Sequence, residues 1–219
     1  MYQDLLNGKK RIEYSAQLIK DKNFTEASEY AEEARRNFHK ASGNLEKINS
    51  NFLIRNIFFV QTQIDGLIYL TSTAEVLSRT AISFSTVGAD IKNTIGEERV
   101  AFSDLSTHKK RSILSILHKS TPELNGMRAN IDLAINNIDN IKYGILLFPI
   151  KNKIENLNIY LKEAISFLDD AVPLSQIMPS LLGFPEKSSF LVLMQNKDEL
   201  RPTGGFIGTY GILETRDGD

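Results

Sequence analysis

Residues 24–48 read FTEASEYAEEARRNFHKASGNLEKI, and their apolar positions repeat with the period of an α-helix. The spacing from one apolar residue to the next alternates between three and four along the whole stretch. This alternation places the apolar side chains on one stripe, close to a coiled-coil seam, and leaves the intervening polar residues facing water. We predict one continuous helix over 24–48 with this stripe buried: Phe24, Ala27, Ala31, Ala34, Phe38, Ala41, Leu45 and Ile48.

A second amphipathic segment precedes this helix. The polar turn 20–23 joins the two, Asn23 is placed to cap the second helix, and Glu26 would complete a capping box. A short polar joint between amphipathic helices predicts an antiparallel helical hairpin. The apolar residues expected to mark the first helix are Leu5, Ile12, Ala16 and Ile19.

More helices are expected along the chain. The pattern over 57–95 is helical but diluted by Ser and Thr, and a shorter helix follows from 106 or 107 to 117. Residues 121–123, Thr-Pro-Glu, form a helix start, because they combine a capping hydroxyl, a first-turn proline and an acid near the positive helix end. Pro149 should open the next helix and Pro173 a last short one. The fold class is therefore mainly α, with long antiparallel helices forming a bundle or stalk.

The composition changes after Gly183. Residues 190–194, FLVLM, are a short continuous apolar run that is typical of a strand buried on both faces, and 206–213 have the pattern of a second strand. We divide the chain into a helical bundle or stalk, 1–183, and a β-hairpin that starts a C-terminal domain, 184–219. Because an isolated hairpin is marginally stable, we expect its strands to pack on the helices or to belong with further strands of a longer protein, and we favour the second.

Composition excludes several classes of function. With 26 Lys and Arg against 27 Asp and Glu, and a net charge of −1, the chain lacks the basic excess of a nucleic-acid-binding protein. Its one basic run, 108–111, is interpreted as a solvated helix face. The absence of cysteine excludes disulfides and thiol nucleophiles. The longest apolar run, 145–150, is far shorter than the roughly 20 residues of a membrane-spanning helix.

The segment between the two predicted strands carries a specific motif. Residues 190–211 read FLVLMQNKDELRPTGGFIGTYG, which closely resembles the signature of a bacterial family known as domain of unknown function 4012. An upstream element, MPSLLG at 178–183, also fits the family pattern, whereas Lys197 and Asp198 depart from it. The residues that match the signature are Gln195, Asn196, Glu199, Leu200, Arg201, Pro202, Thr203, Gly204, Gly205, Phe206, Gly208, Tyr210 and Gly211.

This resemblance implies a bacterial cell-surface protein with an extracytoplasmic body, anchored by a membrane helix upstream of the helical region and outside this chain. It also implies that relatives continue past the motif into a larger α/β part. It implies no defined activity. A distant similarity to the LytR-Cps2A-Psr glycopolymer transferases makes a phosphate-bearing envelope ligand one expected partner.

The motif is also the best candidate ligand site. Arg201 could hold a phosphate or carboxylate with its planar pair of donors, Thr203 could add a hydroxyl, and the two glycines at 204–205 leave backbone N–H groups open to an anion. The alternative is structural: the segment shapes a turn, and Arg201 pairs with Glu199 or Asp198. The motif is not a P-loop, because no Lys-Ser or Lys-Thr pair follows the glycines. The candidate ligand-binding residues are Asn196, Glu199, Arg201, Thr203, Gly204, Gly205 and Gly208.

The other titratable residues predict no catalytic set, metal site or cofactor. The acid pairs at 97–98 and 169–170 are adjacent in sequence, so their side chains diverge by about 100° on a helix and are expected to be solvated. His39, His108 and His118 lack the spacing of a metal site.

Three functions stay open at this point. The first is a non-catalytic stalk or interaction module, which displays the C-terminal domain outside the cell and contacts a protein partner or self-associates through its helices. The second is part of a cell-envelope glycopolymer phosphotransferase, in which Arg201 binds pyrophosphate. The third is a helical sensory domain, against which the β segment argues. Fold class alone does not decide among them.

Overall fold

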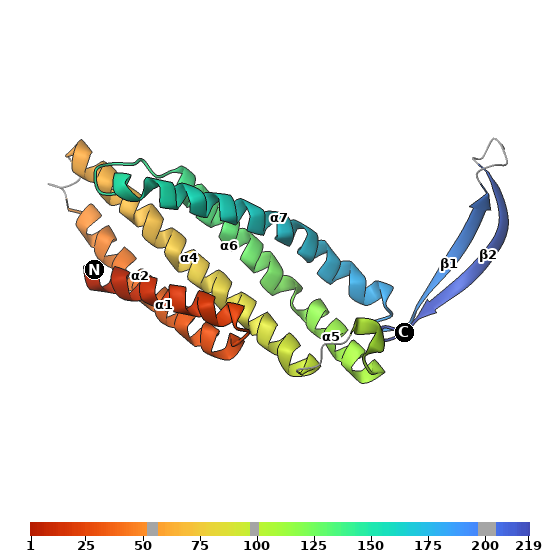
Figure 1. The fold of residues 1–219 in the computed structure, drawn as a ribbon. Helices are drawn as coiled ribbons and strands as arrows, with labels where there is room; N and C mark the ends of the chain where they lie inside the picture. Colours follow the sequence, from red (N-terminus) through yellow and green to blue (C-terminus); the bar gives the residue numbers. More distant parts are fainter. Residues whose placement is uncertain (52–56, 97–100, 197–204) are drawn as a thin grey trace. The chain divides into compact units, whose positions relative to one another are not determined.

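The computed structural model describes residues 1–51, 57–96, 101–196 and 205–219, with only the backbone of Asn196 and Phe206. As predicted, these residues form a mainly α fold that ends in a two-stranded antiparallel sheet (Figure 1). The chain divides into two compact units, the first made of 1–93 and 120–172, the second of 94–119 and 173–219. The predicted domain boundary at residue 183 is a different division and stays a prediction.

The helices match the predicted segments closely. None of those in the described ranges combines the length and the apolar character needed to cross a lipid bilayer. Short 3₁₀ turns lie at Phe102–Asp104 (η1) and Phe148–Ile150 (η2). The α-helices are α1 (Tyr2–Lys20), α2 (Phe24–Asn49), α4 (Phe58–Ile95), α5 (Thr107–Lys119), α6 (Thr121–Asp139) and α7 (Lys151–Leu181).

Helix α2 confirms the prediction of one continuous helix over 24–48 with a buried apolar stripe. Six of its eight stripe residues are buried, from Ala27 to Leu45, and Phe38 is only 5% exposed. The two end residues, Phe24 and Ile48, are partly buried. Asn23 occupies the N-cap position, but its side chain makes no bond to the helix backbone and instead donates to the carboxylate of Glu26 at 2.6 Å.

Helix α1 packs against α2 through small residues, which differs from the expected apolar set. Ala16 is exposed, whereas Gly8 and Ser15 are buried together with Leu18. Glycine and serine leave room for α2 to approach closely, and the Ser15 hydroxyl donates to the backbone carbonyl of Ala27 at 2.7 Å. The helix that Leu5, Ile12, Ala16 and Ile19 were expected to mark is present, and all of these except Ala16 are partly buried.

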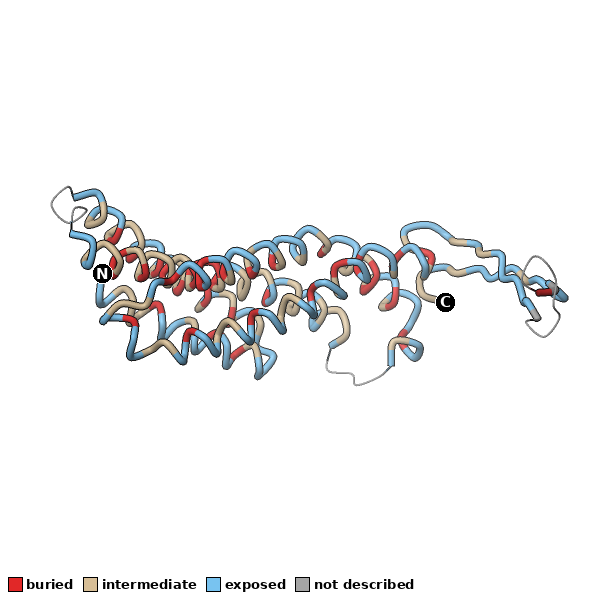
Figure 2. Tube along the Cα trace, turned by 90° about the horizontal axis from the view of Figure 1, so that it is seen from above, coloured by how far each residue is buried: buried red, intermediate tan, exposed pale blue. Residues whose placement is uncertain are grey.

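Helices α4, α6 and α7 share the main core of the first unit. Figure 2 shows its buried residues along the sides where helices meet. A hydrogen bond of 3.1 Å from Asn137 of α6 to the Ser72 hydroxyl joins two of these helices. Their amphipathic faces therefore build one contiguous core, whose buried members are Val76, Met127, Ile131, Ala134, Ile138, Ile141, Leu147, Ile154, Leu161 and Leu168.

Several buried hydroxyls of α4 are satisfied within the helix itself. Thr71, Thr73 and Ser78 donate to the carbonyls of Leu67, Tyr69 and Ala74 at 2.7–2.9 Å. This back-bonding removes the cost of burying a polar group without a partner on another helix. It explains how a segment diluted by Ser and Thr forms a long helix inside the bundle.

The prediction of a separate short helix from Pro173 is wrong. Helix α7 is continuous from Lys151 to Leu181 and contains both Pro173 and Pro179. A proline inside a helix removes one backbone hydrogen bond and costs about 3 kcal/mol. Residues on both sides of Pro173 are buried, including Val172 and Ser175, so packing offsets that cost.

Strands β1 (Ser188–Asn196) and β2 (Phe206–Thr215) form the predicted hairpin. They pair antiparallel, with Ser188 opposite Thr215 at the base and Asn196 opposite Phe206 at the far end.

Candidate functional site

The candidate site predicted from the motif lies at the far end of the hairpin. Four of its residues, Glu199, Arg201, Thr203 and Gly204, lie outside the described residues. Asn196 is the last residue of β1, and it pairs with the first residue of β2. The motif thus joins two neighbouring antiparallel strands, as the sequence predicted.

The two described glycines of the motif have distinct backbone roles. Gly205 is buried and has a φ of 141°, in the region that side-chain-bearing residues rarely adopt. Gly208 lies between Ile207, which pairs with Gln195, and Thr209, which pairs with Met194, so it has no partner of its own. Gly208 is therefore the extra residue of a β-bulge, a feature that increases strand twist and often lies near functional sites.

Both faces of the hairpin are apolar and exposed. On one face Leu191 and Ile212 lie directly opposite each other and are 65% and 69% exposed. On the other face Met194 and Leu213 are more than half exposed. The expectation that 190–194 is buried on both faces is therefore wrong, since the described residues leave both faces open to solvent.

The base of the hairpin is fixed by the turn that follows β2. Lys110 of α5 is 7% exposed, and its ammonium donates to the Asp219 carboxylate at 2.5 Å. Thr107 donates to the same carboxylate at 2.8 Å, and Arg111 pairs with Asp217. The hydrogen bonds from Lys110 first, and from Thr107 second, lower the pKa of Asp219.

Hydrogen bonds to the backbone carbonyls of Leu181 and Leu182 tie the same base to the end of α7. The N–H of Gly218 donates to the Leu182 carbonyl at 2.9 Å, and the Thr215 hydroxyl donates to the Leu181 carbonyl at 2.8 Å. Gly183 has a φ of 75°, and a Cβ there would lie 2.1 Å from the Thr215 carbonyl oxygen. Only glycine fits this position without displacing the strand end.

An aromatic contact completes the base. The peptide bond between Phe184 and Pro185 is cis. The Arg111 guanidinium lies 5.3 Å from the Phe184 ring centroid, and the His118 ring meets the same ring edge-on at 6.1 Å. Arg111 thus contacts both the turn after β2 and Phe184 in the segment that leads into β1, which couples the two ends of the hairpin.

These contacts correct the interpretation of the basic run 108–111 as a solvated face at one position: Lys110 is buried, whereas His108 and Arg111 are exposed. Lys110 and Arg111 hold the hairpin base, while their partners lie more than a hundred residues further along the sequence. Local periodicity carries no information about such partners. The available signal was the position of Lys110 three residues before Ile113, on the apolar side of α5, where a buried cation requires an acid.

Two of the remaining titratable candidates, Asp169 and His39, have charged partners. Asp169 accepts a hydrogen bond from Arg128 at 2.6 Å, and His39 lies 3.4 Å from the buried carboxylate of Glu75. Residues 97–98 lie outside the described residues. Within the described ranges, no three His, Cys, Asp or Glu side chains gather closely enough to hold a metal ion.

The comparison with protein families matches the hairpin and its base. Residues 186–219 match the model described as "Protein of unknown function (DUF4012)". This range begins just before β1 and extends through β2 to the turn that holds Lys110 and Arg111. Searches of the curated proteins and of the solved structures found no match. The resemblance inferred from the ELRPTGGFIG motif is confirmed by this match, which covers residues 186–219.

Proposed function

We propose that this chain is a non-catalytic, extracytoplasmic helical interaction module of a bacterial surface protein, and that its docking element is the DUF4012 hairpin. The observation that carries this proposal is a contrast within the second unit. The base of the hairpin is fixed by contacts with α5 and with the end of α7, whereas both faces of the hairpin are apolar and exposed. The bacterial surface location rests on the family resemblance.

The open faces give the driving force for docking. Burying apolar surface contributes roughly 25 cal/mol per Å², so covering several large side chains stabilises a complex by several kcal/mol. Exposed apolar patches of this kind mark interaction sites on soluble proteins. The apolar side chains available on the two faces are Leu191, Val192, Leu193, Met194, Ile207, Tyr210, Ile212 and Leu213.

The edges of the hairpin favour a partner that adds a β-strand. Glu214 is the one charged residue within β1 and β2, and it is paired with Lys187 at 2.5 Å. Edge strands that avoid pairing with other chains usually carry charges or proline, and these two strands carry neither along most of their length. We therefore assign the partner as a polypeptide that extends this sheet, and a second copy of the chain is the simplest such partner in purified solution.

The test is the oligomeric state across the micromolar range, measured by size-exclusion chromatography with light scattering. The wild-type chain should associate as its concentration rises. Leu191→Lys with Ile212→Glu should keep it monomeric, because these opposite residues become a cross-strand ion pair that preserves the hairpin while making one face polar.

A matched control makes the same chemical change on the helices. Leu133 of α6 and Ile159 of α7 are 48% and 56% exposed, so Leu133→Lys with Ile159→Glu removes exposed apolar surface elsewhere. This variant should associate as the wild type does. A wild-type chain that stays monomeric, or a control that dissociates equally, would show that the hairpin is not the docking element.

A further inference from the structure

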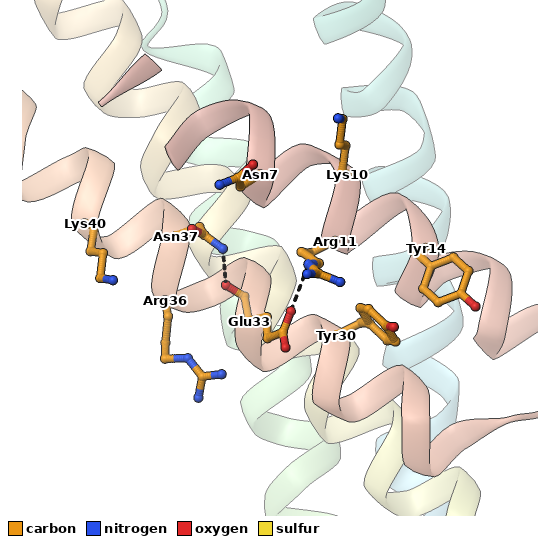
Figure 3. Close-up of a pocket in the computed structure, with 9 residues that line it drawn as sticks. All are labelled: Asn7, Lys10, Arg11, Tyr14, Tyr30, Glu33, Arg36, Asn37 and Lys40. Atoms are coloured by element: carbon orange, nitrogen blue, oxygen red, sulfur yellow. Dashed lines mark hydrogen bonds and ion pairs between the residues drawn. The ribbon is translucent and has the colours of Figure 1, made fainter. Parts of the chain in front are cut away.

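A cavity of about 620 Å³ lies along the outer flank of the α1–α2 pair, far along the sequence from the motif. Figure 3 shows the residues that line it: Arg11 of α1 reaches Glu33 of α2 at the centre, and the tyrosines lie towards one end. The two helices run antiparallel along the groove, so Arg11 of α1 lies opposite Glu33 of α2, and Tyr14 lies opposite Tyr30. At 1.5 Å per residue, the lining from Asn7 to Tyr14 is roughly 10 Å long.

The lining concentrates positive charge in a chain whose net charge is −1. It holds four cationic side chains, Lys10, Arg11, Arg36 and Lys40, and one carboxylate, Glu33, which gives a local charge of 4 − 1 = +3. Glu33 is already engaged by Arg11 at 2.8 Å. Lys10, Arg36 and Lys40 therefore supply charge beyond what the lining itself neutralises.

The acids next to the groove are also engaged. Asp4 is held by the N-terminal ammonium at 2.7 Å. Glu32 accepts two hydrogen bonds from Arg35 at 2.7 and 2.8 Å, whereas Arg36 lies 3.8 Å from it. Exposed lysine and arginine side chains change rotamer at small cost, so these cations are able to close around an anion.

The other end of the groove is aromatic. The rings of Tyr14 and Tyr30 meet edge-on with centroids 4.6 Å apart, and the Arg11 guanidinium lies 5.1 Å from the Tyr30 centroid. Tyr14 is 47% exposed, which leaves ring surface for a ligand to contact. The groove thus offers cations along its length, with Lys40 farthest from the tyrosines (Figure 3), and a face for a planar or sugar ring at the tyrosine end.

We infer that this groove binds a ligand carrying a pyrophosphate group esterified to a ring. Its phosphates contact Lys10, Arg36 and Lys40, and its ring contacts Tyr14. Arg11 is held in place by Glu33 and Tyr30, so it presents a fixed guanidinium between the two ends. This site is independent of the hairpin and of the function proposed for it.

The experiment is isothermal titration of the full chain with three probes: inorganic pyrophosphate, uridine diphosphate and uridine. Uridine diphosphate should bind most tightly, pyrophosphate more weakly and in a salt-dependent manner, and uridine not measurably. The variant Lys10→Gln/Arg36→Gln/Lys40→Gln should weaken both phosphate probes by about tenfold or more, because charge-assisted hydrogen bonds are lost. Tyr14→Leu should reduce uridine diphosphate binding to the level of pyrophosphate.

A charge-matched control uses three basic residues of the same helices that do not line the groove, Lys9→Gln/Lys20→Gln/Lys47→Gln. Its circular dichroism spectrum and its binding of both probes should match the wild type. Equal loss in the control would mean that net charge alone attracts the anion and would overturn the site. Absence of wild-type binding, or full binding in the groove variant, would overturn it as well.

Discussion

The contact between Gly8 of α1 and Phe38 of α2 allows a sharp test of how the first two helices pack. A Cβ at position 8 would lie 2.8 Å from Cε1 and 2.9 Å from Cζ of Phe38, closer than a methyl group and a ring carbon can approach. Phe38 is 5% exposed, so its ring has little room to move away. Gly8→Ala must therefore shift the ring or separate the helices.

The expected free energies follow from these contacts. Phe38→Ala should lower the free energy of unfolding by about 3–5 kcal/mol, since it removes a buried aromatic ring. Gly8→Ala gains up to about 1 kcal/mol of helix propensity and loses about 1–3 kcal/mol by overpacking, so on its own it should be neutral or destabilising. In the Phe38→Ala background the clash is absent, and Gly8→Ala should stabilise by about 1 kcal/mol. The coupling energy between the two positions is therefore about 1–3 kcal/mol.

The assay is urea unfolding of the four chains of this cycle, followed by far-UV circular dichroism. Gly43→Ala is the matched control, because Gly43 also lies in α2 and a Cβ there meets nothing within 4 Å. It should stabilise the wild-type and Phe38→Ala chains equally. If Gly8→Ala stabilises the wild-type chain as much as Gly43→Ala does, the close packing of Gly8 against Phe38 is refuted.

Three further predictions concern the hairpin. Gly183→Ala should increase amide hydrogen exchange in β1 and β2, because it places a Cβ at a φ of 75° and 2.1 Å from the Thr215 carbonyl oxygen. Gly96→Ala is the control: Gly96 has the same φ but no atom within 4 Å of its Cβ position, so this change should leave the exchange unchanged. The pKa of Asp219 is lowered in the folded state, so its contact with Lys110 should be present above the ordinary aspartate pKa and be lost as the pH falls through the lowered value. An NMR titration of the turn should show the loss of this contact. Lys110→Met should abolish the contact at every pH. Arg201→Lys is measured in the background of the groove variant Lys10→Gln/Arg36→Gln/Lys40→Gln. If the motif binds anions, this change should weaken pyrophosphate binding without changing the unfolding midpoint, because lysine lacks the planar pair of donors. Unchanged binding would support the alternative that the motif only shapes a turn.

The helices could be predicted from the sequence wherever their apolar residues form a single stripe with helical spacing. In α2 the alternation of apolar and polar residues fixed both the extent and the buried face. The buried face of α1 was hidden because Gly8 and Ser15 contribute space and a hydroxyl rather than hydropathy. Pro173 misled for the opposite reason: a local rule predicts a break, but burial on both sides keeps α7 continuous.

For the hairpin, the strands could be predicted from the sequence, but the contacts that hold its base could not. Its strands and their antiparallel order followed from the apolar runs and the intervening Pro and Gly residues. The contacts of Lys110 and Arg111 with the turn at 216–219 could not be predicted, because they join residues more than a hundred positions apart. The candidate ligand role of Arg201 rests on the motif alone, since that residue lies outside the described part of the chain.

The bulge at Gly208 has a consequence for how β1 and β2 keep their alignment. When one face of a strand is polar, slipping by one residue exposes apolar side chains and is penalised. Here both faces are apolar, so a slip would exchange Leu191 and Val192 between equivalent surroundings at little hydrophobic cost. The alignment must then be held by other means: the unpaired glycine at one end, and the bond from Thr215 to the Leu181 carbonyl at the other. The bulge at Gly208 and the hydrogen bond of Thr215 therefore fix the register of two strands whose apolar pattern alone would allow a shift.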